Sequence, residues 1–163
     1  MPRLRPLLHD LRRIAEGCVA FLEYLLTKDR VEIGLGQWSA ETPVARQGDP
    51  NRYGVTISNL RGDRADVTVA IDIYAVDDPV HPGGHYAHFG KRLSVRPRAS
   101  VHARIEYDWR TRARFIVGDT AWPPDHFWRG TLDRLGTYSI HAVLLDARGT
   151  RLESLGVYQE LKL

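Results

Sequence analysis

The sequence predicts a mainly-β protein, an antiparallel β-sandwich with one N-terminal amphipathic α-helix. Between residues 31 and 161, about seven or eight short stretches alternate apolar with polar residues and are separated by turn residues, which is typical of strands. The first 30 residues instead repeat their apolar residues at a helical period. We therefore expect a helix in residues 1–30 and a sandwich in residues 31–163.

A hairpin is expected at the C-terminal end of the sandwich. In the stretch 136–146, GTYSIHAVLLD, the side chains of Tyr138, Ile140 and Leu144 fall on one side of a strand and the intervening residues fall on the other. Residues 146–149, DARG, have the composition of a tight turn. Residues 151–161 then return as the partner strand.

Five further strands are expected, over residues 31–38, 53–60, 66–76, 89–95 and 101–107, with a possible short strand at 113–117. The rest of residues 108–135 is interpreted as one long irregular loop, and residues 41–51 as a polar connection. The predicted core consists of the inward-facing residues Tyr53, Val55, Val67, Val69, Ile71, Ile73, Val101, Ile105, Ile140 and Leu144.

The order of strands and turns over residues 50–161 resembles a known family. An NLRGD turn at 59–63 precedes the long alternating strand, and a Gly-x-Tyr at 136–138 opens the C-terminal hairpin. This Gly-x-Tyr resembles the tyrosine corner of immunoglobulin-like sandwiches. The whole order resembles bacterial cell-adhesion-related and polycystic-kidney-type immunoglobulin-like domains. The resemblance implies an immunoglobulin-like antiparallel sandwich, from which the long segment 108–135 departs.

Residues 4–27 form the expected helix, whose apolar residues cover an arc of about 160°. An arc of this width is expected to be buried against the protein's own sandwich, among sister helices of an oligomer, or at a membrane surface. The first 30 residues carry six Lys or Arg and four acidic residues, a balance that suits anionic lipid. The predicted membrane- or partner-docking residues are Leu4, Leu7, Leu8, Leu11, Ile14, Cys18, Phe21, Leu22 and Leu25.

The start of the chain also looks like the start of the iron–sulfur subunit on the membrane arm of bacterial respiratory complex I. Both have a short basic amphipathic helix followed by a Val-Glu-Ile strand, and the cluster-binding cysteines of that subunit are absent here. The resemblance implies a shared anchoring device. We expect a non-enzymatic accessory or structural subunit docked on the cytoplasmic side of a larger respiratory or photosynthetic membrane complex. A soluble assembly or a homo-oligomer formed through the helix is the alternative.

Aromatic and arginine side chains gather in the long loop. Such residues are favoured anchors of protein interfaces. The predicted interface residues are Trp109, Arg112, Arg114, Trp122, Phe127, Trp128 and Arg129. Two other interpretations remain open, a small hydrophobic cluster that orders the loop and a platform for binding a carbohydrate.

Three histidines within eight residues form the most ligand-rich stretch. His81, His85 and His88, which follow Asp77 and Asp78, could together bind zinc or copper. Their spacing matches no standard metal motif, and histidines in an exposed loop without a metal are the alternative. The sequence therefore ranks metal binding below a protein contact, and no cofactor is expected.

Composition excludes several function classes. The 20 Arg and 3 Lys are spread along the chain, and the net charge is only +3, so nucleic acid is not an expected partner. The mean hydropathy of -0.34 argues against an integral membrane protein. The single cysteine, Cys18, excludes an internal disulfide, and no secretory signal is expected, which favours a cytoplasmic location. No common catalytic motif is present, so no enzymatic activity is expected.

Overall fold

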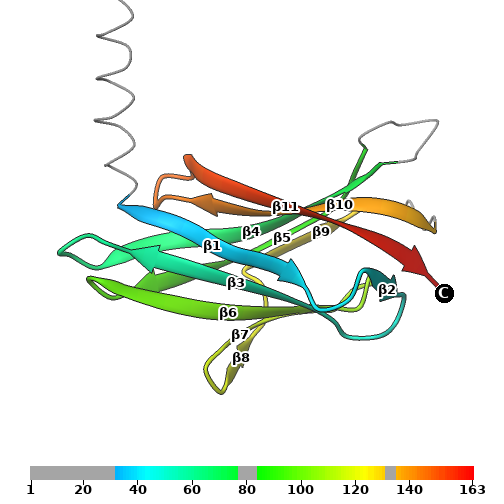
Figure 1. Cartoon of the computed structure of the whole chain (residues 1–163), viewed down its shortest axis with the longest axis horizontal. Helices are drawn as coiled ribbons and strands as arrows, with labels where there is room; N and C mark the ends of the chain where they lie inside the picture. Colours follow the sequence, from blue (N-terminus) through cyan, green and yellow to red (C-terminus); the bar gives the residue numbers. More distant parts are fainter. Residues whose placement is uncertain (1–31, 77–83, 131–134) are drawn as a thin grey trace, which may run out of the picture. The chain divides into compact units, whose positions relative to one another are not determined.

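The computed structural model describes residues 32–76, 84–130 and 135–163. Within these ranges the regular elements are all strands, and they form two sheets that share one core (Figure 1). The prediction of a mainly-β fold with one helix is therefore corrected to an all-β fold for the described part. The predicted helix, residues 4–27, and its docking residues from Leu4 to Leu25 lie outside the described residues.

One sheet contains five strands in the order β1-β3-β6-β7-β8, each antiparallel to its neighbours. They are β1 (Ile33–Ala40), β3 (Asn51–Asn59), β6 (Ala99–Tyr107), β7 (Ala113–Val117) and β8 (Thr120–Trp122). Four of these strands were expected from the alternation of apolar residues, including the short β7. The fifth, β8, was not, because three residues are too few to show a period of two.

The other sheet contains six strands in the order β2-β11-β10-β4-β5-β9. They are β2 (Val44–Arg46), β11 (Arg151–Lys162), β10 (Gly136–Leu145), β4 (Ala65–Ala75), β5 (His85–Val95) and β9 (His126–Arg129). The expected hairpin of β10 and β11 is confirmed. The sheet departs from a purely antiparallel one at its edge, where the unpredicted β2 pairs parallel with β11.

The core lies between the two sheets. Nine of the ten predicted core residues are at most 1% exposed, and the tenth, Val101, is partly buried against them. The alternation is kept along β4, where Ile71 and Ile73 are buried and Asp72 and Tyr74 are only partly so. The faces of the strands were thus predicted correctly, since side chains of a strand alternate between its two faces.

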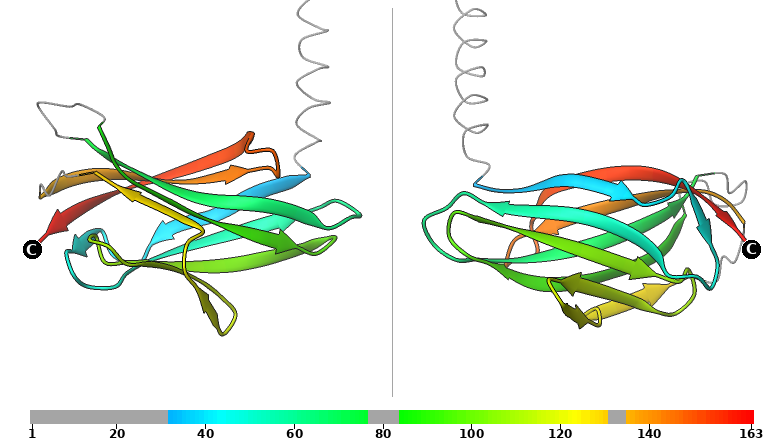
Figure 2. Two further views of the ribbon diagram at one scale, coloured as in Figure 1. Left: turned by 180° about the vertical axis from the view of Figure 1, so that it is seen from behind. Right: turned by 60° about the horizontal axis from the view of Figure 1, so that its bottom comes forward.

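The interpretation of residues 108–135 as one long irregular loop is wrong at β8 and at β9 (His126–Arg129), whereas the possible strand at 113–117 is present as β7. The segment supplies β7 and β8 to the five-stranded sheet and then crosses over to supply β9 to the six-stranded sheet (Figure 2). Strand β9 is stabilised by hydrogen bonds to β5, which is distant in sequence, and its four residues carry little signal of this pairing.

A hydrogen-bonded chain of polar groups crosses the core. The indole Nε1 of Trp109 donates to the hydroxyl of Tyr53 at 3.0 Å, and that hydroxyl donates to Oε1 of Gln159 at 2.5 Å. The Nε2 of Gln159 donates in turn to the backbone carbonyl of Thr42 at 2.8 Å. Burial of these groups is possible because each of them has a partner. Trp109 is thereby part of the core.

Candidate metal centre

Histidines and one aspartate gather on the outer face of the six-stranded sheet. Strands β4 and β5 are antiparallel neighbours, and their register places Asp72 opposite His88. Beyond an irregularity between Ile73 and Tyr74, Tyr74 lies opposite His85. Asp72 lies on the face away from the core because the residues on either side of it, Ile71 and Ile73, are buried.

The three groups lie close enough to share one ion. The Nε2 of His85 is 3.3 Å from Oδ1 of Asp72, and Nδ1 of His88 is hydrogen-bonded to the same oxygen. One ligand atom from each residue lies within 4.8 Å of the other two. The side chain of Asp72 is 17% exposed, and those of His85 and His88 are 37% and 33% exposed. The two histidines are therefore open to solvent, and the carboxylate between them is largely buried.

The carboxylate of this cluster is held in its charged form. Partial burial alone would raise the pKa of Asp72, but the hydrogen bond from His88, together with the neighbouring charges of His88 and His85, outweighs burial and lowers the pKa. A metal ion needs an ionised carboxylate as its ligand. Asp72 is therefore suited to bind a cation at neutral pH.

The geometry fits a tetrahedral ion with small adjustments. Zinc binds imidazole nitrogen and carboxylate oxygen at about 2.0–2.2 Å, so two ligand atoms on one tetrahedral ion lie about 3.3 Å apart. His85 and Asp72 already have this spacing. His88 is in direct hydrogen-bond contact with Asp72 and has to withdraw slightly when an ion enters. Two imidazoles and one carboxylate form a common ligand set of zinc and other divalent transition metals.

Aromatic side chains and a fourth histidine surround the three ligands. The ring of Tyr74 stacks on His85 with a centroid distance of 4.8 Å, and the ring of Trp128 lies 5.3 Å from His85 on the opposite flank. His126 of β9 lies beside His88, with 2.8 Å between their Nε2 atoms. The ligand side chains are thus held laterally by neighbouring strands, which limits their rotamer freedom.

The structure changes the prediction for the histidine-rich stretch in three ways. His81 lies outside the described residues, as do Asp77 and Asp78. His85 and His88 belong to strand β5 and not to an exposed loop, because β5 begins four residues earlier than expected. The carboxylate partner, Asp72, was missed. Its only signal was its outward position on β4, since the register of β4 with β5 cannot be read from spacing along the chain.

The seven predicted interface residues differ in how far they are exposed. Trp109 is fully buried, so it cannot anchor a partner, and Phe127 is partly buried against the core. Trp122 and Trp128 are about half exposed, at 48% and 50%. They sit on strands of different sheets, β8 and β9. The guanidinium of Arg129 donates to the carbonyl of Arg110 at 2.9 Å.

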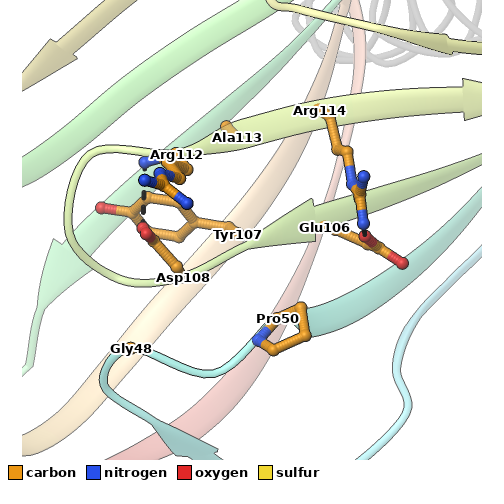
Figure 3. A pocket seen from close by; sticks show the side chains of 8 residues that line it. All are labelled: Gly48, Pro50, Glu106, Tyr107, Asp108, Arg112, Ala113 and Arg114. Atoms are coloured by element: carbon orange, nitrogen blue, oxygen red, sulfur yellow. Dashed lines mark hydrogen bonds and ion pairs between the residues drawn. The ribbon is translucent and has the colours of Figure 1, made fainter.

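The two remaining arginines, Arg112 and Arg114, line a pocket of about 330 Å³ at one end of β6 and β7 (Figure 3). Arg114 and Arg52 both donate to the carboxylate of Glu106, at 2.6 and 3.1 Å. Burial would raise the pKa of Glu106, but these two bonds and the arginine charges outweigh it and lower the pKa. The ionic groups here satisfy one another, which indicates a structural role.

Comparison with known proteins identifies the fold but no family. No protein-family model and no curated protein matches the sequence. A β-glucosidase from Listeria innocua, solved with gluconolactone, has a TM-score of 0.52 and 12% identity over 81% of this chain and 16% of its own. The alkylpurine DNA glycosylase of Pseudomonas fluorescens, bound to DNA containing an abasic site analog, has a TM-score of 0.50 and 18% identity over 81% of this chain and 31% of its own. This chain spans less than a third of either protein.

A CARDB domain from Pyrococcus furiosus, solved with di-metal ions, has a TM-score of 0.42 and 15% identity over 80% of this chain and 87% of its own. At identities this low, the similarities to the two enzymes show a shared β-sandwich fold and nothing about activity.

Within the described ranges, no helix is long and apolar enough to cross a membrane.

Proposed function

We propose that this protein is a non-enzymatic β-sandwich module that binds one divalent transition-metal ion, with zinc as the first candidate, through Asp72, His85 and His88. The observation that carries the proposal is the convergence of one carboxylate oxygen and two imidazole nitrogens within 4.8 Å of one another. The sequence ranks a metal below a protein contact. We place the metal site first, and its support is the carboxylate of Asp72 beside the two histidines, together with the burial of Trp109.

The strands that hold Asp72 and His88 in place, and the charge of Asp72, favour metal binding over a chance cluster of side chains. Asp72 and His88 are opposite each other on central strands of the sheet, so their backbones are held by hydrogen bonds on both sides. The lowered pKa of Asp72 keeps its negative charge available. Sites built on strands hold their ligands more accurately than sites built on loops.

The position of the site favours a module that is not an enzyme. Three protein ligands leave a coordination position open, as in catalytic zinc sites. Enzymes, however, bury their substrates in clefts. The described cluster lies on the outer face of a sheet, and the pocket at Glu106 is lined by other residues. An external ligand at the open position would therefore be held mainly by the ion itself.

We expect one zinc ion per chain, measured by elemental analysis after dialysis and by competition with a chromophoric chelator. Substitutions Asp72→Ala and His85→Ala each remove one of three ligands. They are expected to weaken zinc affinity by more than about 100-fold, since even a partner outside the coordination shell contributes about 10–100-fold. Both positions are at least partly exposed, so the variants should remain folded.

The matched control is His102→Ala. His102 is an exposed histidine on the five-stranded sheet, where it contacts only the hydroxyl of Thr56 among the interactions described for it. Its loss should leave the stoichiometry and affinity unchanged. Equal zinc binding by wild type and Asp72→Ala, or no binding by wild type at micromolar zinc, contradicts the proposal.

We also propose that the sandwich belongs among immunoglobulin-like domains of the bacterial cell-adhesion-related type. The support is the order of strands and turns over residues 50–161, together with the core positions of Tyr138 and the hairpin that follows it.

A second candidate function is a protein contact, as in an accessory subunit of a larger assembly. The observation that favours it is the exposure of Trp122 and Trp128, since large aromatic rings half open to solvent are typical anchors of interfaces. The expectation that the assembly is membrane-associated rests on residues 4–27, which lie outside the described residues. The contact that the described residues support is made by the two tryptophans.

The contact is tested by native fractionation of cells that produce the tagged full-length chain. If the second candidate is correct, wild type migrates in an assembly larger than its own mass, and the double variant Trp122→Ala, Trp128→Ala migrates as a monomer. Leu152→Ala, which removes an apolar side chain of similar exposure at 44%, is the control and should leave the assembly intact. Migration of wild type as a monomer excludes this function.

A further inference from the structure

His126 lies outside the group of three ligands but contacts one of them. Its Nε2 is 2.8 Å from Nε2 of His88, and the two ring planes differ by 27° with a centroid distance of 4.6 Å. The two rings are thus roughly parallel and stacked, with their Nε2 atoms at hydrogen-bond distance. One of the two nitrogens therefore carries the proton and the other accepts it.

The position of His126 is built by the strands around it. Strand β9 pairs with β5 so that His126 lies opposite Gly90. A side chain at Gly90 would place its Cβ 2.6 Å from Cε1 of His126, so only glycine leaves room for the ring. Asp125 anchors the start of β9, because its carboxylate accepts from Nζ of Lys91 at 2.6 Å and from the backbone N–H of Arg92 at 2.7 Å.

The tautomers follow from the partners of each nitrogen. Without an ion, a neutral His88 donates its Nδ1–H to the ionised Asp72, so its Nε2 is the acceptor and His126 donates. When Nδ1 of His88 binds a cation, that nitrogen cannot keep its proton. The proton of a neutral His88 then resides on Nε2, and the hydrogen bond to His126 has to run in the opposite direction.

We propose that His126 is a positioning residue of the cation site, which accepts the Nε2–H of cation-bound His88 and thereby fixes its tautomer and ring orientation. This inference rests on the proposed function. His126 can accept only as a neutral ring with its own proton on Nδ1. Each ring carries one proton before and after binding. Each proton changes nitrogen by exchange with solvent, and none is released by this pair.

A metal-bound histidine usually donates its other ring N–H to an acceptor outside the coordination sphere, although a carboxylate or a backbone carbonyl is a more frequent acceptor than a second imidazole.

The test measures zinc affinity of the full chain by chelator competition. His126→Leu removes the acceptor and is expected to weaken zinc binding about 10–100-fold. His126→Gln keeps an acceptor oxygen and is expected to recover most of the affinity. Gly90→Ala displaces the ring without changing a ligand and is expected to weaken binding in the same range. His102→Leu is the matched control, because His102 is an exposed histidine on the other sheet.

A second readout separates positioning from a general effect on folding. In ¹⁵N–¹H correlation spectra of the histidine rings, zinc should move the proton of His88 from Nδ1 to Nε2 and that of His126 from Nε2 to Nδ1. An affinity of His126→Leu within about twofold of wild type, or zinc-bound His88 with its proton still on Nδ1, overturns the inference while the zinc site stands. If wild type binds no zinc, the proposed function and this inference both fail.

Discussion

Replacing Trp109 with alanine is expected to lower the free energy of unfolding by about 3–5 kcal/mol. The side chain is fully buried, and its ring packs among those of Tyr86, Tyr107 and Tyr138 at centroid distances of 5.8, 5.6 and 4.9 Å. Alanine leaves a cavity between these rings. It also removes the donor to the hydroxyl of Tyr53. The measurement is chemical denaturation followed by far-UV circular dichroism.

The backbone of Trp109 shows how the ring enters the core. Its φ of 58° lies in the left-handed region, which a residue with a large side chain rarely adopts. The carboxylate of Asp108 holds this turn by accepting the backbone N–H groups of Arg110, Thr111 and Arg112 at 2.8, 3.0 and 3.0 Å. The hydrogen bonds of the turn and the burial of the ring together offset the strain.

Two tyrosines provide the controls for this prediction. Tyr53→Phe leaves the indole N–H of Trp109 and the amide oxygen of Gln159 without their shared partner, and we expect a loss of about 1–3 kcal/mol. Tyr107→Phe removes a buried hydroxyl that has no hydrogen-bond partner among the described residues, and its effect should be neutral or slightly stabilising. A loss below about 1 kcal/mol for Trp109→Ala, as for a surface residue, would contradict the assignment of Trp109 to the core.

Replacing Ile71 with alanine is expected to cost about 2–5 kcal/mol of unfolding free energy. Ile71 is fully buried on the central strand β4, between Ala142 of β10 and Phe89 of β5. Removal of its side chain leaves a cavity that neighbouring rigid strands cannot fill. Ile71→Val, which removes a single methylene group, should cost about 0.5–1.5 kcal/mol.

The control for Ile71 is Thr68→Ala on the same strand. Thr68 is only partly buried on the opposite face, so its substitution should change stability by about 0.5 kcal/mol or less. Equal losses for Ile71→Ala and Thr68→Ala would show that the two faces of β4 are not distinguished by burial.

The prediction that Trp109 is an exposed interface residue is wrong, and the reason is physical. In the sequence, this residue stands between Asp108 and Arg110 and looks like an exposed anchor among charged residues. A single residue in the left-handed region turns the side chain toward the interior while its charged neighbours remain outside. No periodic pattern records such a change of direction, because it involves one residue.

The candidate metal centre was half predicted. His85 and His88 are close in the sequence and were recognised as possible ligands. Asp72 and His126 come from β4 and β9, which approach β5 only through the pairing of the six-stranded sheet. Gly90 leaves room for the ring of His126, but this role cannot be predicted from the sequence until β9 is known to pair with β5.

The sequence by itself determined the strands of five or more residues, their inward faces and the C-terminal hairpin, because alternation and turn chemistry are local properties of the chain. Only the tertiary structure decided that the segment after Tyr107 divides its strands between both sheets, and that a carboxylate and two histidines meet on one face. These features depend on the order and register of strands distant in sequence. A shift of one residue in the pairing of β4 with β5 would place Asp72 and His88 on opposite faces of the sheet.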